Sequence, residues 1–241
     1  MTYISQWYIS TMRIFDFMDR LKAGKGGREH IRDLKDVMHS VKVLPKGIYG
    51  ITSEGFGQTH LESAKIFLDA GIRIIQYREK VSPDLEEAIA IKKLCSSYGA
   101  LFIVNDHVDI AISSKADGLH IGQEDIQLTE AKKKFKGIIG VSATNIEEAL
   151  KAQKDGADYL GVGTMFATDT KTDAKPVSFG EFERIRGAVS LPIYAIGGIK
   201  YEHVHMIKKL GADGIAVISS VLAAPDPKLA AVALIDKWSK S

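Results

Sequence analysis

The strongest constraint on the fold is a repeating pattern that begins near residue 47 and continues to the C-terminus. Each repeat has a short apolar run, a polar loop and a stretch of apolar residues at helical spacing. The apolar runs are Ile48–Thr52, Ile72–Tyr77, Leu101–Val104, Gly118–His120, Ile138–Val141, Tyr159–Gly161, Pro192–Ala195 and Gly214–Ile218. Strands that alternate with helices predict parallel βαβ units, and eight such units predict a closed (β/α)8 barrel.

The stretches with helical spacing support the same architecture. They are, to within a residue or two, Thr59–Ala70, Asp84–Tyr98, His107–Ser113, Leu128–Phe135, Ile146–Lys154, Phe179–Ile185, Tyr201–Lys209 and Lys228–Trp238. Gly156 and Gly211 follow two of them, as expected where glycine ends a helix just before a strand. The alternative is a doubly wound open sheet. It needs a glycine-rich fingerprint after its first strand, and Ile51–Gly57 does not contain G-x-G-x-x-G.

Residues 1–45 precede this pattern and form two amphipathic stretches separated by Gly24–Gly27. We therefore expect an N-terminal helical extension over residues 1–45 and a barrel over residues 46–241. The extension could cover the barrel floor, take part in a homo-oligomer contact or stay free. Charges such as Arg13 and Asp16 interrupt its apolar positions, so no run reaches the roughly 20 residues of a membrane span, and no secretory leader is predicted.

The composition limits the classes of partner. With 32 basic and 30 acidic residues, the formal net charge of +2 provides no case for a nucleic-acid or membrane partner. The single cysteine, Cys95, cannot form an intrachain disulfide, which favours the reducing cytoplasm. It lies in a predicted helix, so a buried structural thiol is a better interpretation than a nucleophile.

The reactive groups of a barrel come from the carboxyl ends of its strands. Gln76, Arg78 and Lys80 follow the second strand at a spacing of two, which places them on one side of an extended chain, whereas Tyr77 and Glu79 face the other side. One side then carries an amide, a guanidinium and an ammonium group. This pattern predicts ligand binding; a solvated strand edge is the alternative.

Two carboxylates follow the next strands. Asp106 comes directly after Asn105 at the end of the third strand, and Asp125 lies in the loop after the fourth. The pair has the chemistry of a magnesium site, since Mg2+ takes one or two protein carboxylates together with water and phosphate oxygens. Helix capping is the alternative when each residue is taken separately: Asp106 could cap the third helix, and Asp125 could lie in a turn before the fourth.

The loop after the sixth strand carries Thr168, Thr170 and Lys171, which offer an anion short donors and a fixed positive charge. Ser142 closes the fifth strand. Gly197-Gly198 follows the seventh, where backbone N–H groups could approach a phosphate, and Ser219 follows the eighth. Two separate anion sites are therefore predicted, one beside the carboxylates and one after the last two strands.

These strand ends resemble the thiamine phosphate synthase family across essentially all of Gly47–Pro227. The matching motifs are Gln76-Tyr77-Arg78-Glu79-Lys80, Val104-Asn105-Asp106, Gly118–Asp125, Gly140–Ala143, Thr168–Lys171, Ala195–Ile199 and Val217–Ser219. The resemblance implies a (β/α)8 transferase that joins the pyrimidine of 4-amino-2-methyl-5-hydroxymethylpyrimidine diphosphate to the ring nitrogen of a thiazole phosphate. Pyrophosphate is the other product.

The resemblance also implies a role for each matching position. The pyrimidine diphosphate would be held by Gln76, Arg78, Lys80 and Asn105, and Mg2+ would be ligated by Asp106 and Asp125. The diphosphate would also be bound by Ser142 and Lys171. The thiazole phosphate would be held by Gly198, Ile218 and Ser219, and this ligand or the loop would be contacted by Thr168 and Thr170. Arg78, Lys80, Ser142 and Lys171 would be the catalytic group. Which anion Ser142, Thr168 and Thr170 each contact stays open.

The chemistry agrees with this inventory, because a diphosphate leaves once its developing charge is neutralised, without a nucleophile or strong base. A carbocation-like transition state needs water excluded, so we expect the loop Ala167–Pro176 to close over the ligands. Two residues depart from the family pattern: Ala167 lies where proline is usual, and Thr144 where histidine is common. The related thiazole tautomerases use that histidine as acid and base, so Thr144 counts against their activity.

Three functions follow as hypotheses. The first is an Mg2+-dependent, cytoplasmic transferase that makes thiamine phosphate from two small molecules. The second is a thiazole tautomerase-like enzyme. The third is a non-catalytic regulator that binds phosphate ligands on the same barrel, against which both carboxylates, Lys80 and Lys171 argue.

Overall fold

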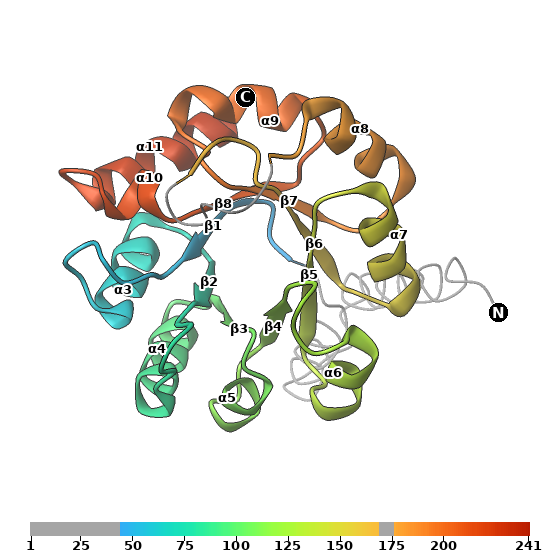
Figure 1. The fold of residues 1–241 in the computed structure, drawn as a ribbon. Helices are drawn as coiled ribbons and strands as arrows, with labels where there is room; N and C mark the ends of the chain where they lie inside the picture. Colours follow the sequence, from blue (N-terminus) through green and yellow to red (C-terminus); the bar gives the residue numbers. More distant parts are fainter. Residues whose placement is uncertain (1–43, 169–175) are drawn as a thin grey trace, which may run out of the picture. The chain divides into compact units, whose positions relative to one another are not determined.

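Eight parallel strands form a closed barrel in chain order in this computed structural model, which describes residues 44–168 and 176–241. β8 pairs with β1 and closes the ring (Figure 1). The strands are β1 Gly47–Ile51, β2 Ile74–Tyr77, β3 Leu101–Asn105, β4 Gly118–Ile121, β5 Ile138–Ala143, β6 Tyr159–Val162, β7 Ile193–Ile196 and β8 Gly214–Val217. The predicted (β/α)8 barrel is confirmed.

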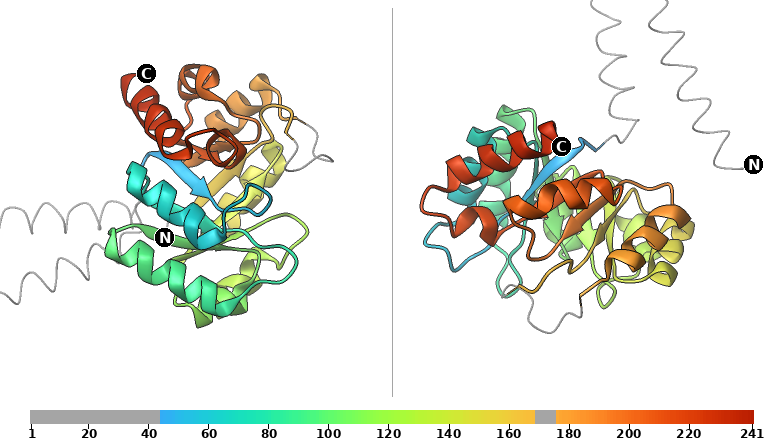
Figure 2. Two further views of the ribbon diagram at one scale, coloured as in Figure 1. Left: turned by 90° about the vertical axis from the view of Figure 1, so that its left-hand side faces the viewer. Right: turned by 90° about the horizontal axis from the view of Figure 1, so that it is seen from above.

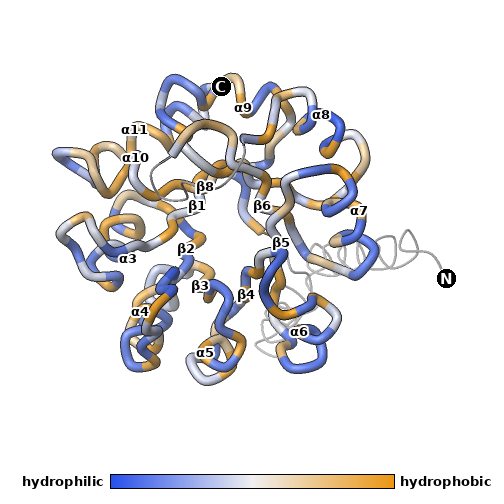
Figure 3. The backbone as a smooth tube through the Cα atoms, in the orientation of Figure 1, coloured by the Kyte–Doolittle hydropathy of each residue, from blue (hydrophilic) through white to orange (hydrophobic). Residues whose placement is uncertain are grey.

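The helices lie outside the strands. They are α3 His60–Ala70, α4 Leu85–Ser97, α5 Val108–Ser113, α6 Leu128–Lys134, α7 Ile146–Asp155, α8 Phe179–Ala188, the 3-10 turn η1 Tyr201–His203, α9 Val204–Lys209, α10 Ser219–Leu222 and α11 Pro227–Lys240. Orange and blue alternate along them in Figure 3, as expected for helices with one buried face. α11 lies beside α3 and β1 (Figures 1 and 2), so the end of the described chain packs against its beginning.

Helix ends follow from local sequence. Thr59 forms a capping box with Glu62 at the start of α3. Gly71 ends α3 in the left-handed conformation, φ 109°, and Gly156 ends α7 in the same way at φ 88°. The N–H of Ile72 donates to the carbonyl of Phe67 at 3.0 Å, so Ile72 belongs to this helix cap. β2 therefore begins two residues later than the apolar run suggested.

Two elements at the C-terminal side differ from the prediction. The expected helix at Tyr201 begins as the 3-10 turn η1 before α9. Ile218, expected as the last residue of a strand, is instead the N-cap of the short helix α10. Such a short helix leaves no periodic signal in the sequence.

The strands have two apolar faces. The outer face packs against the helices, with Ile75 and Tyr77 of β2 as examples. The inner face fills the barrel, where the rings of Tyr49, Tyr159 and Tyr194 pack with centroids 5.5 to 6.1 Å apart. The barrel is therefore a packed core and not a pore.

Two strand glycines leave room for side chains that project into the barrel interior. A Cβ atom at Gly140 would lie 2.0 Å from Cζ of Tyr159, and one at Gly161 would lie 3.1 Å from Cε1 of His120. The tyrosine and histidine rings therefore depend on these glycines for their positions.

The N-terminal helical extension predicted over residues 1–45 lies outside the described residues as far as residue 43. Leu44 is buried in the barrel interior, and the carbonyl of Pro45 accepts a hydrogen bond from the hydroxyl of Tyr194 at 2.5 Å. The described part of the barrel therefore begins at Leu44, two residues before the expected boundary. Within the described ranges, every helix is too short or too polar to cross a membrane.

Cys95 is fully buried in α4, and burial raises the pKa of its thiol to about 12. The expectation of a buried structural thiol is confirmed, since a protonated, inaccessible thiol is a poor nucleophile.

Candidate active site

The predicted alternation after β2 is present. Gln76 is buried, Arg78 is half-buried and Lys80 is exposed, with Nζ of Lys80 3.4 Å from Oδ2 of Asp106. Burial lowers the pKa of Arg78, while the charges of Asp106 and Glu79 oppose that shift. An amide, a guanidinium and an ammonium group thus lie at the end of one strand, the last two beside a carboxylate of the next.

Glu79 faces the other way and holds the turn after β2. Its Oε1 atom accepts hydrogen bonds from the N–H groups of Val81 at 2.6 Å and Ser82 at 3.2 Å. Its Oε2 atom lies 3.3 Å from Nε2 of His60. The hydrogen bond from Val81, opposed by burial, is the main cause of the lowered pKa of Glu79. Glu79 therefore anchors the backbone that carries Arg78.

Glu54, His60 and Glu79 bring three potential metal-ligand atoms within 4.8 Å of one another. Both ring nitrogens of His60 already have protein partners, because Nδ1 lies 2.7 Å from Oγ1 of Thr52 and Nε2 faces Glu79. We therefore assign these three residues a structural role, in which they stabilise the turn that follows β2.

The two predicted metal carboxylates lie side by side. The N–H of Asp106 donates to the carbonyl of His120 at 2.8 Å, and Oδ2 of Asp125 accepts from the N–H of Gly122 at 2.7 Å. Burial, followed by the neighbouring Asp125, raises the pKa of Asp106 to about 6. Burial opposes ionisation of Asp125 too, but hydrogen bonds from Asp106 and Gly122 lower its pKa overall. Two such groups share one proton more readily than they both ionise.

Neither carboxylate caps a helix, so the capping alternative is wrong for Asp106, whereas Asp125 does lie in the turn before α6. The N-cap of α5 is His107 and that of α6 is Gln127, and neither helix has a side-chain cap. Asp106 also adopts a left-handed backbone conformation, φ 61°, which is uncommon for a residue with a side chain. Both carboxylates are thus directed to the carboxyl ends of the strands by loop geometry rather than by a helix.

Asn105 adds a donor at the same edge. The residue is 6% exposed, and its Nδ2 atom has no hydrogen-bond partner among the described residues. A buried amide without a partner is costly, so such a group fits a ligand that supplies an acceptor.

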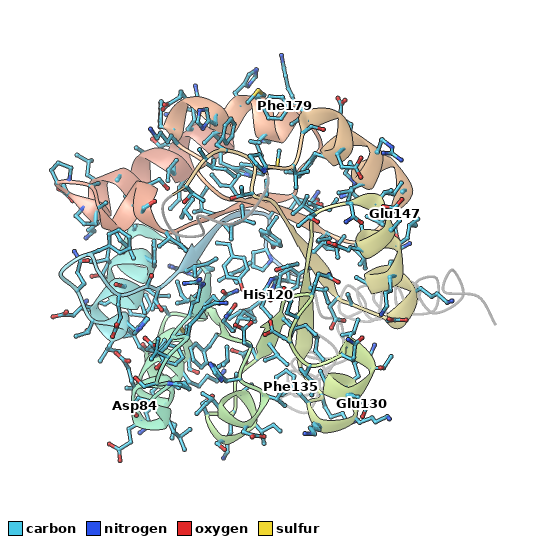
Figure 4. All side chains as sticks on the ribbon, in the orientation of Figure 1. Asp84, His120, Glu130, Phe135, Glu147 and Phe179 are labelled. Carbon is cyan, nitrogen blue, oxygen red and sulfur yellow. The ribbon has the colours of Figure 1, made fainter. Side chains whose placement is uncertain are left out.

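Ser142 is joined to the barrel interior through His120. Nε2 of His120 lies 3.0 Å from Oγ of Ser142, and Nδ1 lies 3.0 Å from the hydroxyl of Tyr159. That hydroxyl lies 3.0 Å from the hydroxyl of Tyr49, which accepts a hydrogen bond from Nε2 of Gln76 at 2.8 Å. Figure 4 shows His120 inside the ring of strands. Burial lowers the pKa of His120 to about 4, so its ring is neutral at pH 7.

The glycine pair after β7 has a packing reason that the sequence did not reveal. Both residues have positive φ, 95° at Gly197 and 61° at Gly198. A Cβ atom would lie 1.8 Å from Oγ1 of Thr164 at the first position and 2.4 Å from the carbonyl oxygen of Ala167 at the second. The absence of side chains at Gly197 and Gly198 therefore allows the segment that follows β6 to pack closely against this turn. A phosphate role for Gly198 stays a prediction.

The remaining predicted site residues follow β6, β7 and β8, away from the ends of β2 to β5, or lie outside the described residues. Ile218 and Ser219 lie at the start of α10 after β8, and Thr168 is half-buried. Thr170 and Lys171 lie outside the described residues, as does most of the expected loop Ala167–Pro176. Thr144 is exposed, and its hydroxyl donates to Oε2 of Glu148 at 3.0 Å, so it supports the start of α7.

The structure thus gathers seven predicted residues at the ends of β2 to β5: Gln76, Arg78, Lys80, Asn105, Asp106, Asp125 and Ser142. Sequence reasoning missed the interior residues that connect them, Tyr49 and Tyr159. The available signal was glycine in mid-strand, at Gly140 and Gly161, which indicates a close approach by another group.

A closed barrel with amide, basic and carboxylate groups at the carboxyl ends of adjacent strands defines a (β/α)8 protein whose polar groups gather where this fold usually binds ligands. Residues 48–221 match the family model described as thiamine monophosphate synthase. The chain belongs to this family, which confirms the resemblance found at its strand ends.

Relatives agree with the family model. The chain is 47% identical over 203 residues to the thiamine-phosphate synthase of Caldivirga maquilingensis, covering 82% of this chain and 99% of that protein. It is 45% identical over 193 residues to the thiamine-phosphate synthase of Archaeoglobus fulgidus, covering 78% and 91%. The solved thiamine phosphate pyrophosphorylase from Pyrococcus furiosus superposes with a TM-score of 0.76 at 37% identity, covering 80% of this chain and 96% of that one.

Proposed function

We propose that the chain is a thiamine-phosphate synthase. It joins the pyrimidine of 4-amino-2-methyl-5-hydroxymethylpyrimidine diphosphate to the ring nitrogen of a thiazole phosphate and releases pyrophosphate. The observation that carries the proposal is the cluster at the ends of β2, β3 and β4, where Lys80 lies 3.4 Å from Asp106 and Asp106 neighbours Asp125. A cation, two carboxylates and Arg78 at one barrel mouth suit a metal-bound diphosphate.

We infer that Asp106 and Asp125 hold Mg2+. The residues fit, because both supply oxygen ligands, and burial together with the neighbouring Asp125 raises the pKa of Asp106, as expected where two carboxyl groups share one site. When bound, Mg2+ would supply positive charge to the departing diphosphate.

The protein groups around that position would bind and orient the pyrimidine diphosphate. Arg78 and Lys80 would contribute positive charge, and Ser142 would donate a hydrogen bond, as would the Nδ2 atom of Asn105, which has no partner among the described residues. Lys171 would add charge from the loop after β6. The C–O bond to the diphosphate breaks with its electron pair leaving on pyrophosphate. The lone pair of the thiazole ring nitrogen then forms the C–N bond.

This step needs no proton transfer, so it needs no nucleophilic side chain and no strong base. The cation-like carbon must be kept from water, which would be the role of the loop Ala167–Pro176. Electrostatic stabilisation of the leaving group, rather than covalent catalysis, is then the main contribution of the protein.

The second anion site would lie on the other side of the barrel mouth. Gly198, Ile218 and Ser219 would hold the thiazole phosphate, with Thr168 and Thr170 contacting this ligand or the loop. The two sites would then face each other across the ends of the strands, so a thiazole nitrogen could approach the pyrimidine carbon. The small phosphorylated substrates and the single, buried Cys95 support a cytoplasmic location.

Product formation tests the proposal directly. The purified chain is mixed with both substrates, with Mg2+ or with a chelator, and pyrophosphate and thiamine phosphate are measured. We expect both products in equal amounts, only with Mg2+ and only when both substrates are present. Absence of pyrophosphate under Mg2+ would refute the proposal. Binding of both ligands without turnover would support the regulator, and aromatisation of the thiazole precursor alone would support the tautomerase.

A further inference from the structure

A row of hydrogen bonds crosses the barrel interior from Gln76 to Ser142. It runs from Nε2 of Gln76 to the hydroxyl of Tyr49 at 2.8 Å and from there to the hydroxyl of Tyr159 at 3.0 Å. It continues to Nδ1 of His120 at 3.0 Å and from Nε2 of His120 to Oγ of Ser142 at 3.0 Å. The proposed reaction moves no proton, so these buried groups need a purpose other than acid–base catalysis.

The row has a direction, because each group can donate only the hydrogens it has. The amide of Gln76 donates to Tyr49, so the hydrogen of Tyr49 must go to Tyr159, its other hydrogen-bond partner among the described residues. Tyr159 then donates its own hydrogen to Nδ1 of His120. A neutral ring that accepts at Nδ1 carries its hydrogen on Nε2 and donates it to Oγ of Ser142.

The opposite direction leaves a buried group unsatisfied. If Ser142 donated to His120, then His120 would donate to Tyr159 and Tyr159 to Tyr49. Tyr49 would accept two hydrogen bonds, and its own hydrogen would have no acceptor among the described residues. Tyr49 is 2% exposed, so that hydrogen could not reach water. An unmade hydrogen bond in a buried place is costly, which favours the first direction.

We propose that Tyr159 holds His120 as its Nε2–H tautomer, and that His120 in this form makes Ser142 a hydrogen-bond donor to an anionic oxygen of the diphosphate. Tyr159 and His120 are therefore positioning residues. Ser142 accepts from the ring, so its own hydrogen is free to turn toward the ligand. In the opposite arrangement that hydrogen would be used by His120, and Ser142 would present a lone pair to an anion. The identity of the anion rests on the proposed function; the direction of the row does not.

The tautomer of His120 can be measured without substrate. In 15N-labelled full-length protein near pH 8, the ring nitrogens of the seven histidines are recorded, and His120 is assigned by its absence in His120→Gln. We expect a protonated Nε2 and an unprotonated Nδ1 in the wild type, and a shift toward a mixture of tautomers in Tyr159→Phe. A protonated Nδ1 in the wild type would overturn the proposal.

Kinetics and inorganic pyrophosphate binding test the consequence for Ser142. Tyr159→Phe and Ser142→Ala should each lower kcat by about 10- to 100-fold, with a smaller change in KM, because a hydrogen bond to developing charge is strongest in the transition state. The double variant should be no slower than Ser142→Ala alone, since both changes remove one interaction. Additive losses would overturn the proposal.

Tyr194→Phe is the matched control. This tyrosine packs in the same interior cluster, but its hydroxyl donates to the carbonyl of Pro45, outside the row. We expect kcat and pyrophosphate affinity close to the wild type. An equal loss in Tyr194→Phe and Tyr159→Phe would show a general packing effect and would refute the positioning role.

His120→Gln supplies a second variant that does not depend on folding of Tyr159→Phe. An amide N–H can take the place of Nε2–H, so His120→Gln should retain more activity than His120→Leu, which has no donor. Equal activities of these two variants would contradict the proposal. If the wild type makes no product, the proposed function fails, while the tautomer measurement still decides the direction of the row.

Discussion

Nζ of Lys80 lies 3.4 Å from Oδ2 of Asp106, and this contact joins the end of β2 to the end of β3. The lysine side chain is 53% exposed, so the pair contributes under about 1 kcal/mol to stability. Its significance is in the site, because Asp106 is also the neighbour of Asp125. Opposite charges from three strand ends are thereby concentrated at one mouth of the barrel.

Removal of one carboxylate should impair metal use. We expect Asp106→Asn and Asp125→Asn each to raise the Mg2+ concentration needed for half-maximal activity by about tenfold or more, since each removes a charged ligand. Activity as a function of Mg2+ measures this. Asp109→Asn on the exposed face of α5 makes the same charge change and should behave as the wild type. Unaltered Mg2+ dependence in both site variants would contradict the metal assignment.

Loss of the half-buried guanidinium should reduce turnover without unfolding the protein. We expect Arg78→Ala to lower kcat/KM by about 100- to 1000-fold, or roughly 3 to 4 kcal/mol of transition-state stabilisation. Steady-state kinetics and a circular dichroism spectrum measure the two effects. Arg184→Ala, at an exposed position of α8, is the control. A site variant as active as that control would show that Arg78 does not act on the leaving group.

Glu79 should support stability in a pH-dependent way. Its pKa is lowered, chiefly by the hydrogen bond from Val81, from an ordinary value of 4.5. A depressed carboxyl pKa stabilises the fold fully above that ordinary value, and the stabilisation disappears as pH falls through the lower folded-state value. We expect Glu79→Gln to reduce the free energy of unfolding at pH 7 by about 1 to 2 kcal/mol. The variant should therefore unfold at a lower temperature than the wild type. The difference from the wild type should shrink below pH 4.5.

Thermal unfolding from pH 3 to pH 8 measures this difference. Glu86→Gln, in the first turn of α4, is a control that should show a small and nearly constant effect. A gap between Glu79→Gln and the wild type that widened toward low pH would contradict the assigned sign.

The glycine pair should tolerate no side chain. We expect Gly198→Ala to cost about 2 kcal/mol or more, because the residue has φ 61° and its Cβ would lie 2.4 Å from the carbonyl oxygen of Ala167. In α8, the new Cβ of Gly187→Ala would have no atom of the described residues within 4 Å, so this change should instead raise stability by about 0.5 to 1 kcal/mol. Urea unfolding of the two variants gives the comparison. Equal stabilities would show that the segment after β6 moves freely.

Much of the site could be predicted because a barrel assigns each strand end to the same mouth. Gln76, Arg78 and Lys80 were placed on one side by their spacing of two, and their approach to Asp106 follows from the order of the strands. The capping alternative for Asp106 could not be excluded in advance, because a carboxylate before a helix is compatible with both roles. Only the backbone showed that His107 occupies the N-cap position.

The sequence by itself determined the period of strands and helices, the chemical groups at each strand end and the side of the strand on which each group lies. These are local properties, set by spacing and by residue type. The contact of Tyr49 with Tyr159, separated by 110 residues, was decided by the tertiary structure, as was the row through His120 to Ser142. Barrel closure and register bring these hydroxyls within hydrogen-bond distance, and no pattern in one strand records the side chain that faces it from another.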